Sequence, residues 1–448
     1  MRSHLLERRP GGRYEFHDLL RAYAAEQVRR EESETERTEI LRRCLAWYLH
    51  TAYAAQCAMA PFDRYDMDDR IPAPATALRF ENYRSAFDWY RAESANLVTA
   101  TRAAADAGFP EIAWRLAVVL RAVYMHQNAF DDWEATARIG VEAAARTGEQ
   151  HGEAEALETL GKAAFQALRL DEAEEHHRDS LALRRRIGDR RGMAVSVNAL
   201  GLLGLRRRRL DEASAHFADG AEIFRELGDR RWTALVRSNL AETLCELGRG
   251  EGAQALIEQV LADFRELGDR ACEGNALCLL SWAQRTSGEA EAVARSIHAA
   301  LSIADDENNE VWQGHWWAEA ARVERARGNR EESLRLFQKS AAVQQKLGDA
   351  FREANALDGA GEAYQSLGRF EEAAELHRRA ANTYRRLDSP WQLARAQAHL
   401  ADALTSSGDH ESARATREEA LHLLGSFDDP RAIALTEKVA QRLSDDDG

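Results

Sequence analysis

Apolar residues along most of this chain recur with the spacing of amphipathic helices. In the segment 190–229, one run places Val195, Ala199 and Leu203 on a single face, and a second apolar run follows a short polar break. A spacing of three or four residues puts side chains on the same side of a helix. The segment therefore predicts two helices joined by a tight turn, which form a helical hairpin.

This hairpin repeats with a period of forty residues. Small residues occupy two columns twelve positions apart: Gly161, Gly201, Ala241, Ser281, Ala321, Gly361 and Ala401, then Ala173, Ala213, Ala253, Val293, Ser333, Ala373 and Ala413. Small side chains in both columns let the two helices of a hairpin approach closely. Self-similarity at a fixed period of this length is typical of solenoids.

Glycines mark the ends of the helices. One column holds Gly248, Gly288, Gly328, Gly368 and Gly408, with Leu168 and Arg208 in the earlier copies. A second column holds Gly148, Gly188, Gly228, Gly268 and Gly348, with Asn308, Asp388 and Asp428 where the pattern weakens. Glycine adopts the left-handed cap conformation at little cost, so both columns predict turns that follow a helix.

The small positions, followed four residues later by an aromatic or aliphatic residue such as Phe217 or Ile257, resemble the tetratricopeptide repeat in a lengthened, forty-residue form. The resemblance implies an all-α, right-handed superhelical solenoid whose concave groove is lined by the first helix of each hairpin. We expect seven units over residues 151–430 and a degenerate unit over 109–150. A C-terminal helix and acidic tail are expected over 431–448.

The segment before the repeats predicts a small N-terminal region and a helical adaptor. In residues 1–32, Gly11-Gly12 predicts a turn, Arg13–Phe16 a strand, and Asp18 the N-cap of a helix. Residues 33–108 predict the adaptor, which includes a helix from Phe80 to Asp106. A proline-rich loop near residues 58–77 interrupts it, either folded against its neighbours or acting as a joint.

The strand, the His17-Asp18 pair and the following Leu-Leu-Arg-x-Tyr-Ala helix resemble the end of the winged-helix segment in bacterial STAND regulators of the NB-ARC class, in particular AfsR-like regulators of secondary metabolism. In that family the histidine contacts the phosphate of a bound nucleotide, so the resemblance implies a vestigial nucleotide-sensor motif at His17 and Asp18. The chain contains no GxxxxGK[ST] loop, and its one Gly-Lys pair, Gly161-Lys162, lies inside a repeat helix. We therefore weigh a structural role for the pair above nucleotide binding.

The same resemblance implies that the chain corresponds to the repeat region of such a regulator and lacks the nucleotide-binding and DNA-binding domains. It is then either a portion of a longer protein or a stand-alone descendant.

If the register of the repeats holds, polar and aromatic first-helix residues gather in the middle of the groove. Asparagine amides can bond a peptide backbone, arginines can hold a carboxylate with two hydrogen bonds, and tryptophan offers a flat apolar face. The predicted groove residues are Asn198, Asn275, Trp282, Arg285, His315, Arg322, Arg325 and Asn355.

Composition narrows the functional classes. The chain of 448 residues carries 75 acidic and 60 basic side chains, a formal charge of −15, which disfavours direct DNA binding over its surface. Its five cysteines form no CxxC pair, which argues against a disulfide framework or a structural zinc site and fits the cytoplasm. The N-terminus lacks the apolar stretch of a signal peptide, and no run is apolar enough to suggest a membrane span.

Two local patterns leave alternatives open. The segment 311–319 contains three tryptophans, which fit a ligand-binding wall and a plug in a distorted repeat equally well. The arginine runs at 184–186, 190–191 and 206–209 fit contacts with nucleic acid or an acidic partner. Interspersed acidic residues make us favour a solvated face for these runs.

Histidines give a further alternative. His176 and His216 are one period apart and could bind a metal together with Glu172 or Glu212. Two histidines are weak evidence for such a site, and no metal is predicted. His177 lies in the column of Phe217, so we expect it to pack between helices.

No nucleophile elbow, catalytic histidine and serine pair or glycine-rich phosphate loop is present, and no cofactor is predicted. We predict a non-enzymatic sensing and interaction module that binds a peptide or protein segment in its groove and regulates transcription of secondary metabolism. The main alternative is a stand-alone enzyme or small-molecule binder that uses the Trp, His and Arg groove cluster. A scaffold for oligomerisation is a third reading, and the oligomeric state stays open.

Overall fold

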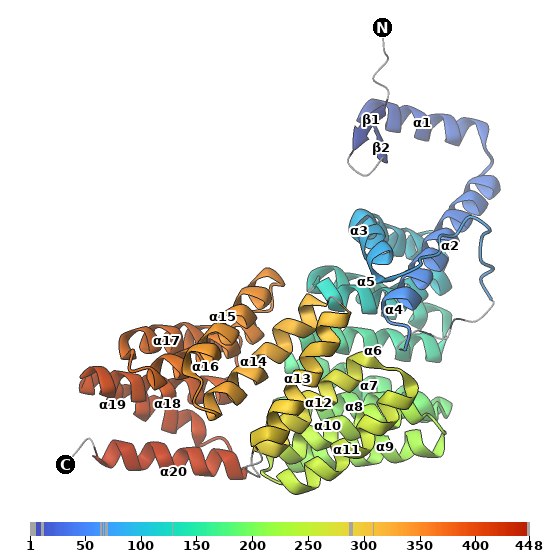
Figure 1. Cartoon of the computed structure of the whole chain (residues 1–448). Coiled ribbons are helices and arrows are strands. Elements are labelled where there is room, and N and C mark those ends of the chain that lie inside the picture. The colour runs from blue at the N-terminus through green and yellow to red at the C-terminus, as the bar shows by residue number, and fades with distance from the viewer. Residues whose placement is uncertain are drawn as a thin grey trace. The chain divides into compact units, whose positions relative to one another are not determined.

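The computed structural model of the chain describes residues 6–9, 13–62, 65, 67, 70–127, 129–285, 290–307 and 309–445. These residues form twenty helices and one two-stranded sheet (Figure 1). The elements are β1 (Leu6–Arg9), β2 (Arg13–Phe16), α1 (Asp18–Glu31), α2 (Glu34–Met59), α3 (Tyr83–Asp106), α4 (Pro110–Gln127), α5 (Phe130–Thr147), α6 (Gln150–Gln166), α7 (Leu170–Ile187), α8 (Arg190–Arg206), α9 (Leu210–Glu226), α10 (Arg230–Glu246), α11 (Gly250–Leu267), α12 (Arg270–Arg285), α13 (Ala290–Asp306), α14 (Glu310–Ala326), α15 (Arg330–Lys346), α16 (Ala350–Ser366), α17 (Phe370–Arg386), α18 (Pro390–Ser407), α19 (His410–Leu424) and α20 (Pro430–Asp445).

The chain divides into two compact units, an N-terminal unit of residues Met1–Gly188 and a C-terminal unit of residues Asp189–Gly448. The division falls inside the expected array of repeats, between one hairpin and the next, and not at the start of the array. The N-terminal unit therefore holds the first full hairpin, α6 and α7, together with everything before it.

At the N-terminus, β2 coincides with the expected strand and pairs antiparallel with β1, so that Leu6 lies opposite Phe16. The expected Gly11-Gly12 turn lies outside the described residues. Helix α1 begins one residue earlier than expected, because His17 and not Asp18 occupies the N-cap position, and no side chain caps it. A hairpin followed by a helix does not by itself establish a winged helix, which stays a prediction.

The helices α2 to α5 share an apolar core in the N-terminal unit. Its largest fully buried side chains include Trp114, Trp133, Tyr90 and Tyr124. The described part of the proline-rich loop folds back onto α2, where Trp47 donates a hydrogen bond to the carbonyl of Thr76 at 2.8 Å. The first of the two readings, a loop folded against its neighbours, therefore agrees with the structure.

The glycine columns have the backbone conformation that their spacing predicts. The glycines of both columns that the structure describes have φ between 67° and 91°, in the left-handed region. Leu168, Arg208 and Asp388 take the same conformation, with φ of 61°, 60° and 47°. The turn geometry follows the repeat at these positions but not at Asp428, and non-glycine residues adopt it at a cost in local conformational energy. Gly288 and Asn308 lie outside the described residues.

The small columns are explained by rings that pack directly on the helix backbone. A Cβ added at Gly201 would lie 2.6 Å from the ring of Phe217, and one at Gly361 would lie 2.6 Å from the ring of His377. The expectation that His177 packs between helices is confirmed, because its buried ring lies against Gly161 in the same way. Glycine therefore occurs where an aromatic ring takes the whole space between two helices.

In the C-terminal unit each helix packs antiparallel on the next, and the first helices α8, α10, α12, α14, α16 and α18 also contact one another (Figure 1). Contacts along this side draw the hairpins together there, so the first helices form the inner, concave wall of the unit. The architecture of the C-terminal unit is an all-α solenoid of helical hairpins. Among the described residues, no helix combines the length and apolarity that a membrane crossing requires.

Candidate functional site

The concave wall of the C-terminal unit is the candidate site, because it carries the predicted groove residues of α12, α14 and α16. Arg285, Arg322 and Arg325 lie there at the ends of α12 and α14, but none of them is left to bind a ligand alone. Glu319 is buried between two of them, with Oε1 2.9 Å from Arg285 Nε and Oε2 3.3 Å from Arg322 Nη1. The repeat register predicts these arginines but not Glu319, the carboxylate that neutralises two of them.

Arg325 is the first residue of a second series of ion pairs, which extends from α14 to α18. Arg325 Nη2 lies 3.0 Å from Glu362 Oε1, and His399 Nε2 lies 4.0 Å from the same oxygen. His399 Nδ1 then faces Asp358 at 3.1 Å, and His377 Nδ1 lies 2.7 Å from Asp358. Charged side chains thus link three consecutive hairpins.

Two groups in this series of ion pairs, Asp358 and His399, have shifted pKa values. Burial disfavours the charged form of Asp358, but His399 and His377 lower its pKa well below the usual range. Burial also opposes the charged form of His399, and Asp358 and Glu362 outweigh it and raise the pKa of His399. Among the described residues, Asp358, His377 and His399 are the group whose ligand atoms lie close enough to hold a metal ion.

The asparagines of the groove are also engaged. Asn275 Oδ1 accepts a hydrogen bond from Trp316 Nε1 at 3.0 Å, and Asn355 Oδ1 accepts one from the hydroxyl of Tyr384 at 3.0 Å. Asn198 is buried between first helices, where its Oδ1 accepts from Asn239 Nδ2. Its assignment to an open groove surface is therefore corrected: it belongs to the packing between α8 and α10.

The tryptophan segment has one buried and two half-buried members. Trp316 is almost fully buried, and a Cβ added at Gly274 would lie 2.1 Å from its ring. Trp312 packs beside it with ring centroids 5.7 Å apart, and the ring of Trp317 lies 5.2 Å from Lys339 Nζ. The plug reading holds for Trp316, which fills the space between α12 and α14.

The two ends of the C-terminal unit meet across the concave wall, which the sequence did not predict. Arg208, in the α8–α9 turn, donates to both carboxylate oxygens of Asp429, in the α19–α20 turn, at 2.7 and 2.5 Å. Glu246 accepts from Arg208 and from Arg431, at 2.7 and 2.6 Å. We call these four residues the clasp. Through Arg431 and Glu246, the start of α20 thus lies against α10.

Aromatic rings flank the clasp. The guanidinium carbon of Arg208 lies 3.9 Å from the ring centroid of Trp391, and that of Arg431 lies 5.6 Å from the ring centroid of Trp282. Arg206 similarly lies 4.1 Å from the ring centroid of Phe351. Trp282 of the predicted groove therefore contacts the chain's own C-terminal helix.

Two titratable groups on the wall have shifted pKa values. Burial and the neighbouring Glu246 raise the pKa of Glu242 to about 7. Burial of the ring, and then the charge of Arg352, lower the pKa of His315, although part of the residue is exposed. In its neutral form His315 can donate one hydrogen bond and accept one.

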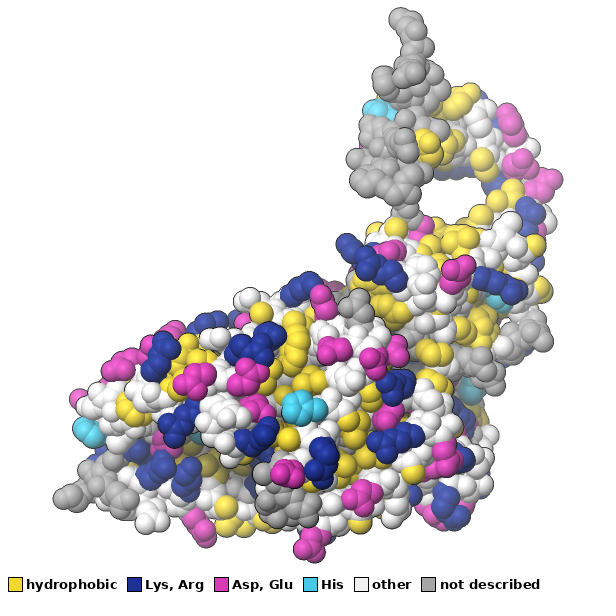
Figure 2. Space-filling view, in the orientation of Figure 1, with side chains coloured by type: hydrophobic (Ala, Val, Ile, Leu, Met, Phe, Trp, Pro, Cys, Tyr) yellow, Lys and Arg dark blue, Asp and Glu magenta, His cyan; other side chains and the backbone are white. Residues whose placement is uncertain are grey.

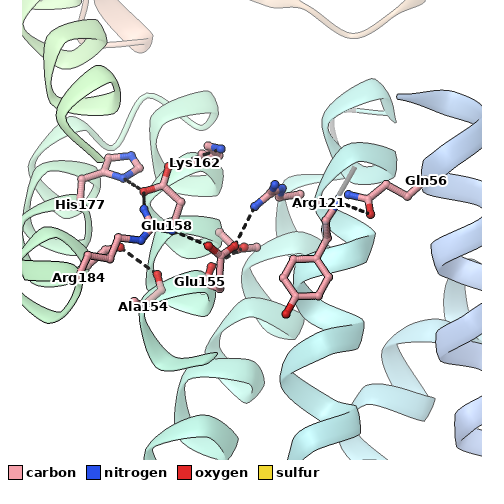
Figure 3. A network of polar contacts seen from close by, with 11 residues as sticks. Gln56, Arg121, Ala154, Glu155, Glu158, Lys162, His177 and Arg184 are labelled. Atoms are coloured by element: carbon pink, nitrogen blue, oxygen red, sulfur yellow. Dashed lines mark hydrogen bonds and ion pairs between the residues drawn. The ribbon is translucent and has the colours of Figure 1, made fainter. Parts of the chain in front are cut away.

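The arginine runs are not simply a solvated face. Arg184, in the N-terminal unit, is buried and paired with Glu155 at 2.7 Å and with Glu158 at 3.1 Å (Figure 3). Burial favours the neutral acid, but His177 and Lys162 lower the pKa of Glu158 well below its usual range. Arg208 of the third run is buried in the clasp. The expectation is therefore wrong for these two arginines, because each neutralises a buried carboxylate.

Elsewhere the surface carries both signs of charge. On the face shown in Figure 2, Lys and Arg side chains alternate with Asp and Glu side chains. His17 and Asp18 are exposed, and Asp18 lies 3.8 Å from Arg21. The nucleotide-sensor role of this pair stays a prediction.

A hollow outside the concave wall lies between α11, α12 and α13. Its volume is about 410 Å³, and Leu261, Leu277, Leu280 and Arg265 are among its lining residues. None of the predicted groove residues lines it.

Comparisons with known proteins agree with this architecture. A family model described as Tetratricopeptide repeat matches residues 315–386, and a second model with that description matches residues 233–267. Among solved structures, a Rap protein complexed with Competence and Sporulation Factor is similar with a TM-score of 0.51 and 11% identity, over 75% of this chain and 97% of that one. This likeness shows the shared fold.

Two curated relatives are similar in sequence. The regulatory protein AfsR of Streptomyces coelicolor is 32% identical over 184 residues, 40% of this chain and 18% of that protein. AfsR of Streptomyces griseus is 34% identical over 185 residues, 40% of this chain and 19% of that protein. The chain thus carries tetratricopeptide repeats, resembles part of AfsR-like regulators, and matches less than a fifth of their length.

Proposed function

We propose that this chain is a non-enzymatic sensing module of an AfsR-like regulator, which binds a peptide or protein segment on the concave wall of its C-terminal unit. What supports the proposal is the placement of Trp282, Arg325 and Asn355 on three consecutive first helices, α12, α14 and α16. A ligand that contacts all three would bridge several repeats, and its binding would favour one curvature of the stack over others.

The arginines of the concave wall are already paired with glutamates, and this limits which ligands can bind tightly. Arg285, Arg322 and Arg325 already face Glu319 and Glu362, so a ligand gains little from its net charge at these positions. It gains more from hydrogen bonds to the guanidinium edges and from packing on Trp282. The Rap protein that shares the fold is described with the Competence and Sporulation Factor, which is in keeping with a role of such solenoids in regulatory binding. Control of secondary metabolism is proposed from the similarity to AfsR.

Selection from a library of random twelve-residue peptides tests this function with the full chain as bait. We expect enriched peptides to bind the wild-type chain and to lose at least tenfold in affinity with Arg325→Gln or Trp282→Ala. The matched control is Arg378→Gln on the second helix α17, where Arg378 also pairs with a glutamate, Glu375, at 3.0 Å. Peptides that lose as much affinity with Arg378→Gln, or a selection that enriches none, would contradict the proposal.

A further inference from the structure

The clasp differs from the other inward-facing ion pairs in where its partners come from. Arg285, Arg322 and Arg325 pair with carboxylates of their own helix or of the next first helix. Arg208 instead uses its Nε and Nη2 on Asp429, which lies 221 residues further along the chain. Asp429 reaches Arg208 because the two ends of the C-terminal unit meet, and not because the two residues lie in neighbouring repeats.

Arg208 has the features of a built carboxylate site. Its side chain is buried, Glu246 holds its Nη1 at 2.7 Å, and its flat guanidinium lies over Trp391. These contacts orient the Nε–H and an Nη2–H as a fork, the geometry that binds a carboxylate with two parallel hydrogen bonds. The fork is therefore held by Glu246 and Trp391 as well as by Asp429.

The backbone conformation of Arg208 is a second unusual feature of this residue. Its φ is 60°, in the left-handed turn where later repeats carry Gly248, Gly328, Gly368 and Gly408. Glycine would fit this turn without strain, whereas a side chain here opposes it. Arg208 keeps its bonds to Asp429 and Glu246 in this strained conformation, which Leu168 and Asp388 share.

Charge complementarity identifies the ligand. Within the clasp, Arg208 and Arg431 are balanced by Glu246 and Asp429. If Asp429 leaves, Arg208 keeps Glu246 alone, which it shares with Arg431, and the site carries one uncompensated positive charge. A ligand carboxylate restores the balance and the two hydrogen bonds together.

Resting on the proposed function, we propose that Arg208 is a carboxylate-binding site of the concave wall, which the chain's own Asp429 fills in this structure. An acidic peptide that binds there displaces Asp429 from Arg208, while Arg431 stays paired with Glu246. A side-chain carboxylate and a C-terminal carboxylate present the same two oxygens, so the test includes both.

The test uses the full chain and labelled peptides that copy residues 424–432, Leu-Gly-Ser-Phe-Asp-Asp-Pro-Arg-Ala. One peptide has an amidated C-terminus. A second has both Asp replaced by Asn and a free C-terminal carboxylate, and a third has both replacements and an amide. The receptor variant is Asp429→Asn, which keeps the N-cap hydrogen bonds to Arg431 and Ala432 while it removes the charge. Its matched control is Asp428→Asn, the neighbouring exposed carboxylate.

We expect Asp429→Asn to bind the first peptide, measured by fluorescence anisotropy, at least tenfold more tightly than the wild type or Asp428→Asn. Adding Arg208→Gly to the Asp429→Asn variant should abolish that gain in affinity. Glycine is chosen because it adopts the left-handed backbone of this turn without strain. Binding of the second peptide shows that a C-terminal carboxylate also suffices, while the third should not bind. Equal or absent binding to Asp429→Asn and Asp428→Asn overturns the site, and so does a gain that survives Arg208→Gly.

A second measurement does not need any peptide. Amide hydrogen exchange in residues 424–433 should be at least tenfold faster in Asp429→Asn than in Asp428→Asn, because the clasp no longer holds the α19–α20 turn. Unchanged exchange would show that the ion pair between Asp429 and Arg208 does not hold this turn, and would overturn the displacement. Failure of these experiments leaves the peptide selection with Arg325→Gln intact as the separate test of the proposed function.

Discussion

Arg208 and Asp429 form a buried ion pair with two hydrogen bonds, although 221 residues separate them in the chain. Burial opposes ionisation of Asp429, and its bonds to Arg208 outweigh this and lower its pKa. The pair joins the first turn of the C-terminal unit to its last helix. The stability of the unit therefore depends on contacts between its ends as well as on its stacked neighbours.

Arg208→Gly should lower the free energy of unfolding by about 2 to 4 kcal/mol. Removing one partner of a buried pair costs about 3 to 5 kcal/mol, and relief of the left-handed backbone returns about 1 kcal/mol. Urea unfolding followed by circular dichroism measures the difference. Asp428→Asn should change it by less than about 0.5 kcal/mol, as expected for an exposed side chain. A loss below about 1 kcal/mol for Arg208→Gly would show that the pair adds little.

Two turn substitutions should have opposite signs. Asp388 has φ of 47° and an exposed side chain, so Asp388→Gly should stabilise the chain by about 0.5 to 1 kcal/mol. Gly348 has φ of 71°, so Gly348→Ala should destabilise it by about 1 to 2 kcal/mol. Thermal unfolding of both variants checks the signs. If both shift the midpoint in the same direction, the left-handed column does not control these turns.

Two helix glycines form a similar pair. A Cβ at Gly274 would meet the ring of Trp316 at 2.1 Å, whereas one at Gly252 would have no neighbour within 4 Å. Gly274→Ala should cost about 1 to 3 kcal/mol, since an overpacked core must move its ring or its helix. Gly252→Ala should gain up to about 1 kcal/mol from helix propensity. Denaturant midpoints distinguish the two, and a tolerated Gly274→Ala would mean that Trp316 is not held tightly.

The His399 ion pairs should make stability depend on pH. The pKa of His399 is raised in the folded state, so its contribution is complete below the unfolded value of about 6.5 and disappears as pH rises through the folded pKa. We expect the stability difference between the wild type and His399→Gln to be larger at pH 6 than at pH 9. Urea titrations at both values measure it. A difference that grows with pH would mean that His399 is neutral beside Asp358 and Glu362.

Much of the fold is predictable from the sequence because it is local. The spacing of apolar residues defines each helix, and the glycine columns define each turn, so their columns alone assign Leu168 and Arg208 to left-handed turns. The column that His177 shares with Phe217 likewise predicts a ring packed between helices. A one-residue error at Asp18 reflects the weak signal of a helix start without a side-chain cap.

The candidate site is predicted less completely. The repeat register locates Trp282, Arg285 and Arg325 on first helices, but it gives no sign that Glu319 is buried beside them. A sequence signal does exist: Glu319 lies three residues before Arg322, within ion-pair reach on one helix face. The register misplaces Asn198, because its column predicts groove lining although its amide bonds to the neighbouring first helix.

By itself the sequence determined the repeating hairpin, its forty-residue period, its left-handed turns and the small residues where two helices approach closely. These features depend on steric contacts within one or two repeats, which spacing records. Only the tertiary structure decided that Arg208 meets Asp429 and that Arg431 reaches Trp282 and Glu246. The reason is that such pairs depend on the rotation accumulated over many hairpins, and a small change at each interface moves their partners apart.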